Sequence, residues 1–398
     1  MRFELKDICK IISGGDKPKI VSQTQTVECQ YPIYGNALDS NGLYGYTNFS
    51  VINEPAVTIS ARGSNCGASF FRSTPYVPIV RLLSLIPNKN KINPKYLYYL
   101  IKNRHFKSTG SGQPQITIPQ IADCKVDIID NMITQKQIAD TLSALDDKIE
   151  LNNQINKRLE QIAKDLYNYW FVQFDFPDEN KRPYKSSGGK MVYNKVLKRE
   201  MPEGWEIKNL AENSLTTILK PGIDTFENEK VYLPTAAIDG DRIIDRNNLI
   251  TYENREGRAN MQPISNSVWF AKMKKTKKIL YFGEYSKNNL DNLIISTGML
   301  GLECKNNSLE YIWNFINDSN FEAQKDKLSH GATQEGVNND DLFYLPILIP
   351  SSEILDKFSK RVKSLYQQKY TNEQENKRLA ELRDFLLPML MNSQVLVG

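Results

Sequence analysis

The chain is poor in the residues that build metal, redox and disulfide sites. It holds two histidines, His105 and His330, and five scattered cysteines with no Cys-x-x-Cys pair. Zinc sites need closely spaced cysteine and histidine ligands, and disulfide frameworks need paired cysteines. We therefore expect no metal, no disulfide framework and no bound cofactor.

Long hydrophobic runs are also missing. No stretch approaches the roughly 20 apolar residues that cross a bilayer, and the opening MRFELKDICK lacks the apolar core of a signal peptide. We expect a cytoplasmic protein with no membrane partner. The formal net charge is only +5, from 51 Lys and Arg against 46 Asp and Glu, so charge alone does not indicate a nucleic-acid partner.

A long helical pattern occurs twice, in residues 135–171 and again from residue 354 onward. The first segment contains no Gly or Pro, and Pro388 is expected to disturb the last turn of the second. Both segments contain the tetrapeptide NKRL, at residues 156–159 and 376–379. Because a chain of 398 residues is too long for one core, we interpret this repeat as an internal duplication.

In each segment the spacing alternates between four and three residues, which is the seam of a coiled coil. The two seams share two central asparagines, Asn152 and Asn156 in the first and Asn372 and Asn376 in the second. If the helices pair antiparallel, Asn152 lies near Asn376 and Asn156 lies near Asn372. Polar pairs of this kind fix the register of a coiled coil.

Two charged residues, Lys369 and Arg383, interrupt the second seam. We expect their charged ends to extend into water. The alternative interpretation places the two segments as amphipathic helices in separate cores. Helices of about 37 residues are longer than most helices of globular proteins, which favours the coiled coil.

A region of short strands and turns precedes each helical segment. Runs such as PAVTISA and KKILYF alternate with turn residues, and KINPKYLYYLIKN and SLEYIWNFIND each predict a helix. The fold class is α+β, with two similar globular domains held apart by a long antiparallel two-helix coiled coil and related by a pseudo-twofold axis. The predicted parts are a first domain at 1–134, a helix at 135–175, a linker at 176–203, a second domain at 204–350 and a helix at 351–398.

The two halves also match in short segments. FELKDI at residue 3 parallels WEIKNL at residue 205, and GSGQPQITIPQ matches SHGATQEGVNN with Gln113 opposite Gln334. Antiparallel helices are expected to place the two domains at opposite ends. A helix of about 37 residues is about 55 Å long, which exceeds one turn of DNA at roughly 34 Å. This length suits a two-part DNA site with an unread middle.

In their order and duplication, these segments resemble the specificity subunits of type I restriction-modification systems. The resemblance covers essentially the whole chain and is carried by IAKDLYNYWFVQFDFP, GSGQPQI with its counterpart GATQEGV, PEGWEIKNL and LRDFLLPML. It implies two target-recognition domains, each reading one half of a split double-stranded DNA sequence. It also implies that two methyltransferase (modification) subunits dock on the helices, that restriction (endonuclease-translocase) subunits join them, and that this chain is not itself an enzyme.

Loop residues with side chains that match base edges or phosphates are the candidates for contact with DNA. In the first domain they are Asn36, Arg62, Ser64, Asn65, Ser111, Gln113 and Gln115. In the second domain they are His330, Thr333 and Gln334, with Arg255, Arg258, Lys274, Lys275 and Lys277 as phosphate contacts. The alternative is that nearby glycines merely shape turns and that Gln113 and Gln334 hydrogen-bond the helix behind them.

Two other classes of function stay open. One is a self-contained nuclease-methyltransferase fragment, although neither a glycine motif for S-adenosylmethionine nor an Asn/Asp-Pro-Pro-aromatic motif occurs. The other is an architectural coiled-coil protein whose two heads bind other proteins. Turnover by the chain alone would favour the first, and failure to retain one DNA sequence selectively would favour the second.

Overall fold

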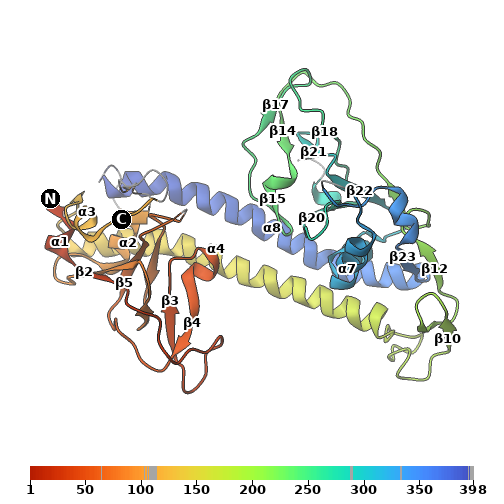
Figure 1. Cartoon of the computed structure of the whole chain (residues 1–398), viewed down its shortest axis with the longest axis horizontal. Helices are drawn as coiled ribbons and strands as arrows, with labels where there is room; N and C mark the ends of the chain where they lie inside the picture. The colour runs from red at the N-terminus through yellow and green to blue at the C-terminus, as the bar shows by residue number, and fades with distance from the viewer. Residues whose placement is uncertain are drawn as a thin grey trace. The chain divides into compact units, whose positions relative to one another are not determined.

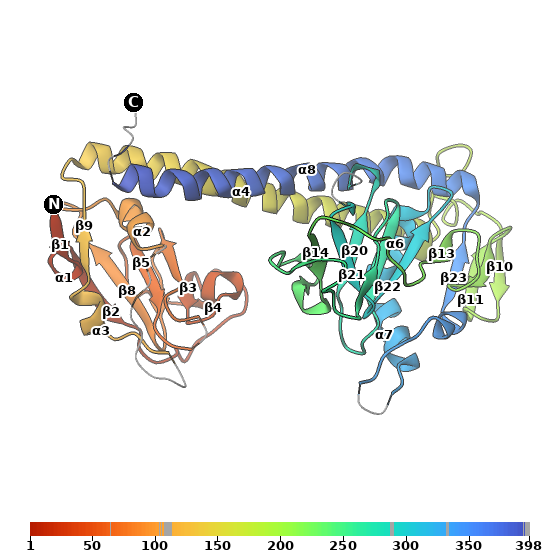
Figure 2. The same ribbon diagram turned by 90° about the horizontal axis from the view of Figure 1, so that it is seen from above.

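The chain divides into two compact units in the computed structural model, which describes residues 1–63, 65–102, 104, 106, 114–286, 290–331, 334–392 and 394. Unit 1 comprises Met1–Asn152 and Gln374–Gly398, and unit 2 comprises Asn153–Glu373. Each unit contains a globular part and a section of each of two long helices, α4 (Met132–Tyr167) and α8 (Ser352–Met391) (Figures 1 and 2).

Unit 1 is built on a four-stranded antiparallel sheet with the order β2-β8-β5-β6. A second sheet has the order β4-β3-β7, with β3 parallel to β7, and β1 pairs antiparallel with β9. The elements in chain order are β1 (Arg2–Glu4), α1 (Leu5–Ile8), β2 (Cys9–Ser13), β3 (Tyr31–Tyr34), η1 (Asp39–Gly42), β4 (Leu43–Thr47), β5 (Ala56–Ser60), β6 (Ser69–Arg72), β7 (Val77–Pro78), β8 (Leu82–Pro87), α2 (Pro94–Lys102), α3 (Ile118–Ala122) and β9 (Lys125–Asp127).

The core of unit 1 joins the four-stranded sheet to α2. Val57 of β5, Leu85 of β8 and Leu97 of α2 are fully buried in it. Helix α2 begins after Asn93, whose side-chain oxygen accepts the N–H of Tyr96 at 3.1 Å and so satisfies a donor that the first helical turn leaves unpaired. The helix predicted within KINPKYLYYLIKN is confirmed.

Unit 2 contains two four-stranded sheets, β13-β22-β19-β20 and β17-β14-β21-β18. Three two-stranded pairs, β10-β11, β12-β23 and β15-β16, complete its strands. The elements are η2 (Asn168–Val172), β10 (Met191–Asn194), β11 (Arg199–Pro202), β12 (Glu206–Asn209), β13 (Thr216–Ile218), β14 (Lys230–Leu233), η3 (Thr235–Ala237), β15 (Ile238–Asp239), β16 (Arg242–Ile243), β17 (Leu249–Ile250), β18 (Ala259–Met261), β19 (Ser267–Ala271), β20 (Ile279–Phe282), η4 (Glu284–Ser286), β21 (Leu293–Ser296), β22 (Met299–Cys304), α6 (Leu309–Asn317), α7 (Ser319–Leu328), η5 (Asp340–Tyr344) and β23 (Pro346–Ile349).

The two units share an order of strand pairing. β2-β8-β5-β6 in unit 1 matches β13-β22-β19-β20 in unit 2, and α2 follows β8 as α6 follows β22. The parallel pair β3 and β7 matches the parallel pair β14 and β21. The matched segment FELKDI overlaps β1 and WEIKNL contains β12. Each of these strands pairs antiparallel with the last strand before a long helix. The similarity in sequence thus accompanies a similarity in topology.

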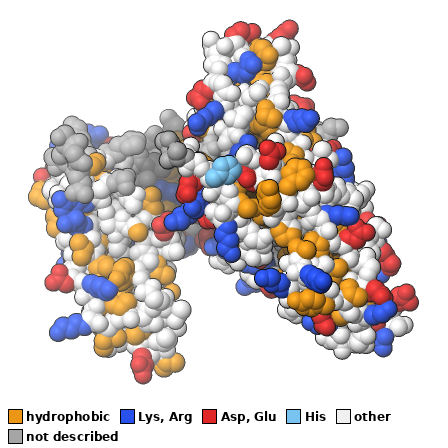
Figure 3. Space-filling model, turned by 45° about the vertical axis from the view of Figure 1, so that its right-hand side comes forward, with side chains coloured by type: hydrophobic (Ala, Val, Ile, Leu, Met, Phe, Trp, Pro, Cys, Tyr) orange, Lys and Arg blue, Asp and Glu red, His pale blue; other side chains and the backbone are white. Residues whose placement is uncertain are grey.

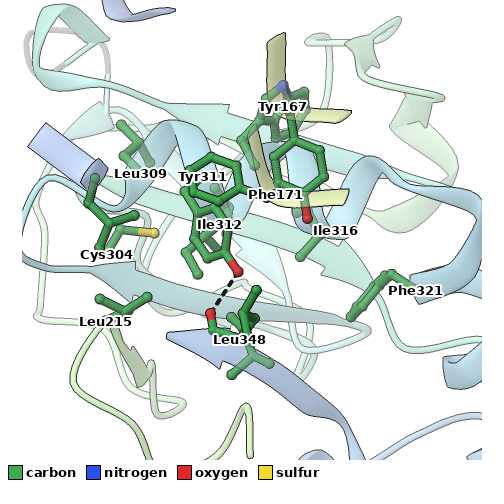
Figure 4. Close-up of a cluster of buried hydrophobic side chains, with 14 of the residues drawn as sticks. Tyr167, Phe171, Leu215, Cys304, Leu309, Tyr311, Ile312, Ile316, Phe321 and Leu348 are labelled. Atoms are coloured by element: carbon green, nitrogen blue, oxygen red, sulfur yellow. Dashed lines mark hydrogen bonds between the residues drawn. The ribbon is translucent and has the colours of Figure 1, made fainter. Parts of the chain in front are cut away.

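Aromatic side chains pack among aliphatic ones in the core of unit 2, where the ends of the long helices meet the sheet (Figure 4). The ring of Phe171, which follows α4, lies 4.6 Å from that of Tyr311 in α6 and 4.9 Å from that of Phe358 in α8. The hydroxyl of Tyr311 donates to the carbonyl of Leu348 at 2.7 Å, so its polar end is satisfied within the core.

The segment 176–203, expected as a linker, is a folded part of unit 2. It contains the hairpin β10-β11, and Phe176 and Met201 are buried in the same core. The ring of Phe176 stacks on those of Tyr184 and Trp205, with centroids 4.6 Å and 5.0 Å away. The segment is therefore folded because its aromatic side chains pack into the core, although its charged and turn-forming composition predicts a linker.

The long helices pair antiparallel within each unit (Figures 1 and 2). In unit 1, the amide of Asn152 donates to Asn376 at 2.9 Å. In unit 2, the amide of Asn372 donates to Asn156 at 2.8 Å. Asn152, Asn156 and Asn372 are all buried, so these bonds satisfy polar groups on a largely apolar seam.

The expectation that Lys369 and Arg383 reach water was wrong. Their side chains are only 15% and 17% exposed, because each finds carboxylates on its neighbours. Lys369 pairs with Glu160 of α4 and, at 2.7 Å, with Asp241. Arg383 donates to Asp146 of α4 at 2.6 Å.

The expected disturbance at Pro388 is small, since α8 continues beyond it to Met391. Proline removes one backbone donor from a helix. The neighbouring Leu387 and Leu390 are buried in the core of unit 1 and hold the last turn in place. In the part of the chain that the structure describes, no helix has the length and apolar character of a membrane span.

Asp146 joins both long helices to the globular part of unit 1, which we call its head. It accepts the hydroxyl of Tyr99 at 2.7 Å and the ammonium of Lys102 at 3.1 Å, in addition to Arg383. Burial alone would raise the pKa of Asp146, but hydrogen bonds from Arg383 and Tyr99 and the charge of Lys102 hold it below its ordinary value. A carboxylate with a depressed pKa stabilises the fold above its unfolded pKa and loses that contribution as the pH falls.

We expect Asp146→Asn to lower the free energy of unfolding at pH 7 by about 1–3 kcal/mol, because buried donors lose a charged acceptor. The difference in the free energy of unfolding between the variant and the native chain should narrow as the pH falls from about 5 to about 3, because Asp146 of the native chain becomes protonated. Urea denaturation at several pH values measures both. The control is Asp140→Asn on the same helix, whose exposed pair with Lys136 is worth at most about 1 kcal/mol. Equal losses in the two variants would contradict the prediction.

Candidate nucleic-acid interface

In unit 1, the loop after β5 is joined to the loop before α3 by backbone hydrogen bonds. The N–H of Gly63 donates to the carbonyl of Pro114 at 3.0 Å, and the N–H of Ile116 donates to that of Ala61 at 2.9 Å. Arg62 and Gln115 face each other in this antiparallel bridge. We refer to residues 61–63, 65–67 and 114–117 as loop pair 1.

Unit 2 contains the same arrangement after β19 and before η5. The N–H of Lys274 donates to the carbonyl of Glu335 at 3.0 Å, and the N–H of Val337 donates to that of Lys272 at 2.9 Å. Residues 272–278, 329–331 and 334–337 form loop pair 2. Gly336 is required in it, because a Cβ atom there would lie 2.9 Å from the carbonyl oxygen of Lys272.

Loop pair 1 brings together candidate residues from three separate parts of the chain. The side chain of Asn36 accepts the N–H of Ala61 at 2.9 Å and donates to the carbonyl of Arg62. The amide of Asn65 donates to the backbone of Asn36 at 3.3 Å. Asn36 therefore holds the backbone of the loop. This role favours the alternative in which a candidate residue shapes a turn over one in which it contacts DNA.

Arg62 and Gln115 are better placed to meet a ligand. The Nε atom of Arg62 is buried and has no hydrogen-bond partner among the described residues. An unpaired buried donor is unusual in a native fold. Gln115 is exposed beside it. The candidates Ser64, Ser111 and Gln113 lie outside the described residues.

Loop pair 2 brings Lys274, His330 and Gln334 together. The backbone of His330 exchanges two hydrogen bonds of 3.0 Å with that of Gly336. The amide of Gln334 donates to the sulfur of Met273 at 3.5 Å, and both His330 and Gln334 are exposed. The candidate Thr333 lies outside the described residues.

The lysines of loop pair 2 are more engaged than the sequence suggests. Lys274 pairs with Glu335 at 2.8 Å, and the ammonium of Lys277 donates to the carbonyl of Asn317 at 2.8 Å. Burial lowers the pKa of Lys272. Lys275 is exposed. On the face drawn in Figure 3, Lys and Arg side chains are interspersed with Asp and Glu and do not form a continuous positive patch. Contact with phosphates on such a face would depend on individual lysines.

Arg255 and Arg258 belong to a different part of unit 2, the turn that precedes β18. The guanidinium of Arg255 lies 3.9 Å from the ring centroid of Tyr252 and donates to that residue's carbonyl. The side chain of Arg258 is exposed, and its carbonyl accepts the N–H of Thr297 at 2.9 Å. Arg258 is therefore the better candidate for phosphate contact.

Two residues that hold loop pair 2 were not among the candidates. Asp326 accepts the N–H of Lys275 at 2.9 Å, and Lys325 is fully buried beneath the turn. A signal was present, because Lys325 follows Phe321 by one helical turn and so lies on the apolar face of α7. Among the described residues, no group of three or more His, Cys, Asp and Glu side chains is arranged to hold a metal ion.

The comparisons with known proteins agree with this architecture. Residues 1–161 match the model of the Type I restriction modification DNA specificity domain. The chain is 26% identical over 375 residues to the type I restriction enzyme HindI specificity subunit of Haemophilus influenzae, covering 80% of this chain and 81% of that protein. It is also 26% identical over 337 residues to the MjaIX specificity subunit of Methanocaldococcus jannaschii, covering 79% and 72%.

The fold is similar to that of a solved structure, the type I restriction-modification S subunit of M. genitalium. The TM-score is 0.58 at 16% identity, over 98% of this chain and 96% of that one. The fold is thus of the mixed α and β class found in specificity subunits. Over most of its length the chain is therefore similar to the specificity subunits of type I restriction-modification systems, which are the non-catalytic components of those systems.

Asn36 provides a test of how loop pair 1 is held. We expect Asn36→Ala to make the amides of residues 61–67 exchange with deuterium about 5- to 30-fold faster, because the loop loses two side-chain hydrogen bonds. Hydrogen–deuterium exchange followed by mass spectrometry measures the rates. Asn53→Ala, which removes an exposed contact with Ser50 in the same unit, is the control and should leave them unchanged. An unaltered rate in Asn36→Ala would show that the loop is held by other contacts.

Proposed function

We propose that this chain selects a two-part sequence in double-stranded DNA and carries modification and restriction subunits to it. The observation that carries the proposal is the recurrence of one backbone arrangement, a bridged loop pair, in two units with the same strand order. Two similar readers suit a split target, and the DNA specificity domain that residues 1–161 match supplies the class of ligand. The recurrence supports an internal duplication with one target-recognition domain in each unit.

Within this proposal, α4 and α8 act as the spacer between the two readers. Their asparagine pairs fix one register, and the helices contain 36 and 40 residues. At 1.5 Å per residue, such helices are about 54 Å and 60 Å long, more than one turn of DNA at roughly 34 Å. A fixed register would give the gap between the two half-sites one length.

The long helices also carry features that suit docked partners. α4 exposes Ile133, Leu151 and Ile162, and α8 exposes Leu382 and Phe385. Contiguous exposed apolar patches mark surfaces that another protein covers, and Leu382 and Phe385, three residues apart, lie on one face of α8. We assign these faces to two modification subunits, with the restriction subunits joining through them.

The function is tested by expressing the chain with its cognate modification subunit and sequencing the methylated adenines of the host genome. We expect one split motif with a spacer of constant length, absent when either protein is omitted. Methylation without the partner would instead support the nuclease-methyltransferase alternative. A complex that retains scrambled DNA as well as any other would support an architectural role and overturn the proposal.

The lysines of loop pair 2 should contribute to binding through phosphates. Changing Lys274 and Lys275 together to alanine is expected to weaken binding to all DNA sequences and to reduce the slope of log affinity against log salt by about 0.9 for each phosphate that is no longer neutralised. Lys274 should contribute less than Lys275, because Glu335 neutralises it. Fluorescence anisotropy at several salt concentrations measures the slope. Lys208→Ala, on β12, is the control; an unchanged slope in the double variant would remove these lysines from the interface.

A further inference from the structure

Lys325 is a fully buried lysine on α7, and its side chain has no exposure to solvent. One helical turn before it, the ring of Phe321 packs at 5.1 Å against that of Phe270 in β19. The helix is thus fixed against the strand that leads into loop pair 2. An ammonium group in such a place is costly unless all its donors are satisfied.

The ammonium of Lys325 has three partners. It donates to the carbonyls of Ala271 at 3.2 Å and Thr276 at 3.1 Å, and it pairs with Glu322 at 2.8 Å. Lysine has three donors and no acceptor, so its hydrogen-bonding capacity is used in full. Ala271 and Thr276 flank the turn 272–275, which Lys325 therefore holds at both ends.

The residue after Lys325 holds the middle of the same turn. Asp326 accepts the N–H of Lys275 at 2.9 Å. Lys275 has a φ angle of 54°, in the left-handed region that non-glycine residues rarely adopt. Such a conformation persists only where surrounding contacts impose it, and Lys325 and Asp326 supply contacts of that kind.

Helix α7 also leads directly into the second loop of loop pair 2. The N–H and the hydroxyl of Ser329 both donate to the carbonyl of Lys325 at 3.0 Å. His330, the next residue, is bonded to Gly336. One turn of α7 therefore contacts both loops of loop pair 2.

We propose that Lys325, together with Asp326, is a positioning residue that sets the geometry of loop pair 2 toward DNA and so determines how faithfully unit 2 reads its half of the target. This inference rests on the proposed function. Lys325 itself would not touch DNA, because it is buried. Its effect would be confined to the half-site read by unit 2, since its partners all lie in that unit.

The test replaces the buried pair as a unit. Lys325→Met alone leaves the carboxylate of Glu322 buried without its cation, which can unfold the domain. The double variant Lys325→Met with Glu322→Leu removes both charges and keeps the volume filled, so the unit is expected to fold while the turn loses the hydrogen bonds to its two carbonyls. Lys327→Met is the matched control, because it removes an exposed lysine from the same helix.

The readout is the methylated motif produced with the cognate modification subunit. For the double variant we expect one half of the motif to become degenerate and the other to stay intact, with discrimination against wrong bases in that half falling on the order of 10- to 100-fold. Deuterium exchange at the amide of Lys275 should be faster. Lys327→Met should change neither.

The outcomes separate this inference from the function on which it rests. A native complex that yields no split motif would overturn both. A split motif whose two halves keep full fidelity in the double variant, or lose it equally, would overturn the role of Lys325 and leave the proposed function in place. Unchanged exchange at Lys275 would also overturn it, because the turn would then be held by other contacts.

Discussion

The structure depends on a simple constraint, that an amide on an apolar helix seam has to find another amide. In unit 1 that pair is Asn152 with Asn376, and in unit 2 it is Asn372 with Asn156. An antiparallel register shifted by even one residue would leave these buried groups without partners, at a cost of about 1–3 kcal/mol for each. The asparagines therefore choose one alignment of α4 against α8, whereas the apolar residues alone would tolerate several.

Ion pairs and hydrogen bonds from charged side chains of the same helices attach the helices to the globular head of each unit. In unit 1, Asp146 of α4 gathers Arg383 from α8 and Tyr99 and Lys102 from α2. In unit 2, Lys369 of α8 gathers Glu160 from α4 and Asp241 from the head. Burial opposes the charge of Lys369, but the surrounding carboxylates raise its pKa above the ordinary value. Each clamp joins three elements, so the head of each unit cannot rotate about its helix pair without breaking a partly buried ion pair.

Features fixed by periodicity could be predicted from the sequence, and features fixed by partners could not. The two long helices, the asparagine pairs and the helices that became α2 and α6 follow from spacing and from turn residues. Lys369 and Arg383 were misplaced, because their carboxylate partners lie elsewhere in the chain. Charged and turn-forming composition predicts a linker at 176–203, whereas the contacts by which its aromatic residues anchor it become apparent only in the structure.

The candidate interface shows the same limit. Glycines and amides marked the loops that form both loop pairs, but the sequence did not reveal that Asn36 serves the backbone or that Glu335 neutralises Lys274. Lys325 was not among the candidates, because its spacing from Phe321 places it on the apolar face of α7 but does not reveal the carbonyls that it holds.

The loop pairs are held in a way that leaves their outward side chains free to differ. Backbone hydrogen bonds join the two loops in each unit, and Asn36 and Lys325 reinforce them by bonding to main-chain groups. A frame of main-chain contacts makes few demands on the residues whose side chains point outward. The same backbone frame is found with different residues in the two units, since Arg62 bridges to Gln115 in one and Met273 bridges to Gly336 in the other. Under the proposed function, similar domains that read different bases need that separation between the residues that hold the loop and those that are displayed on it.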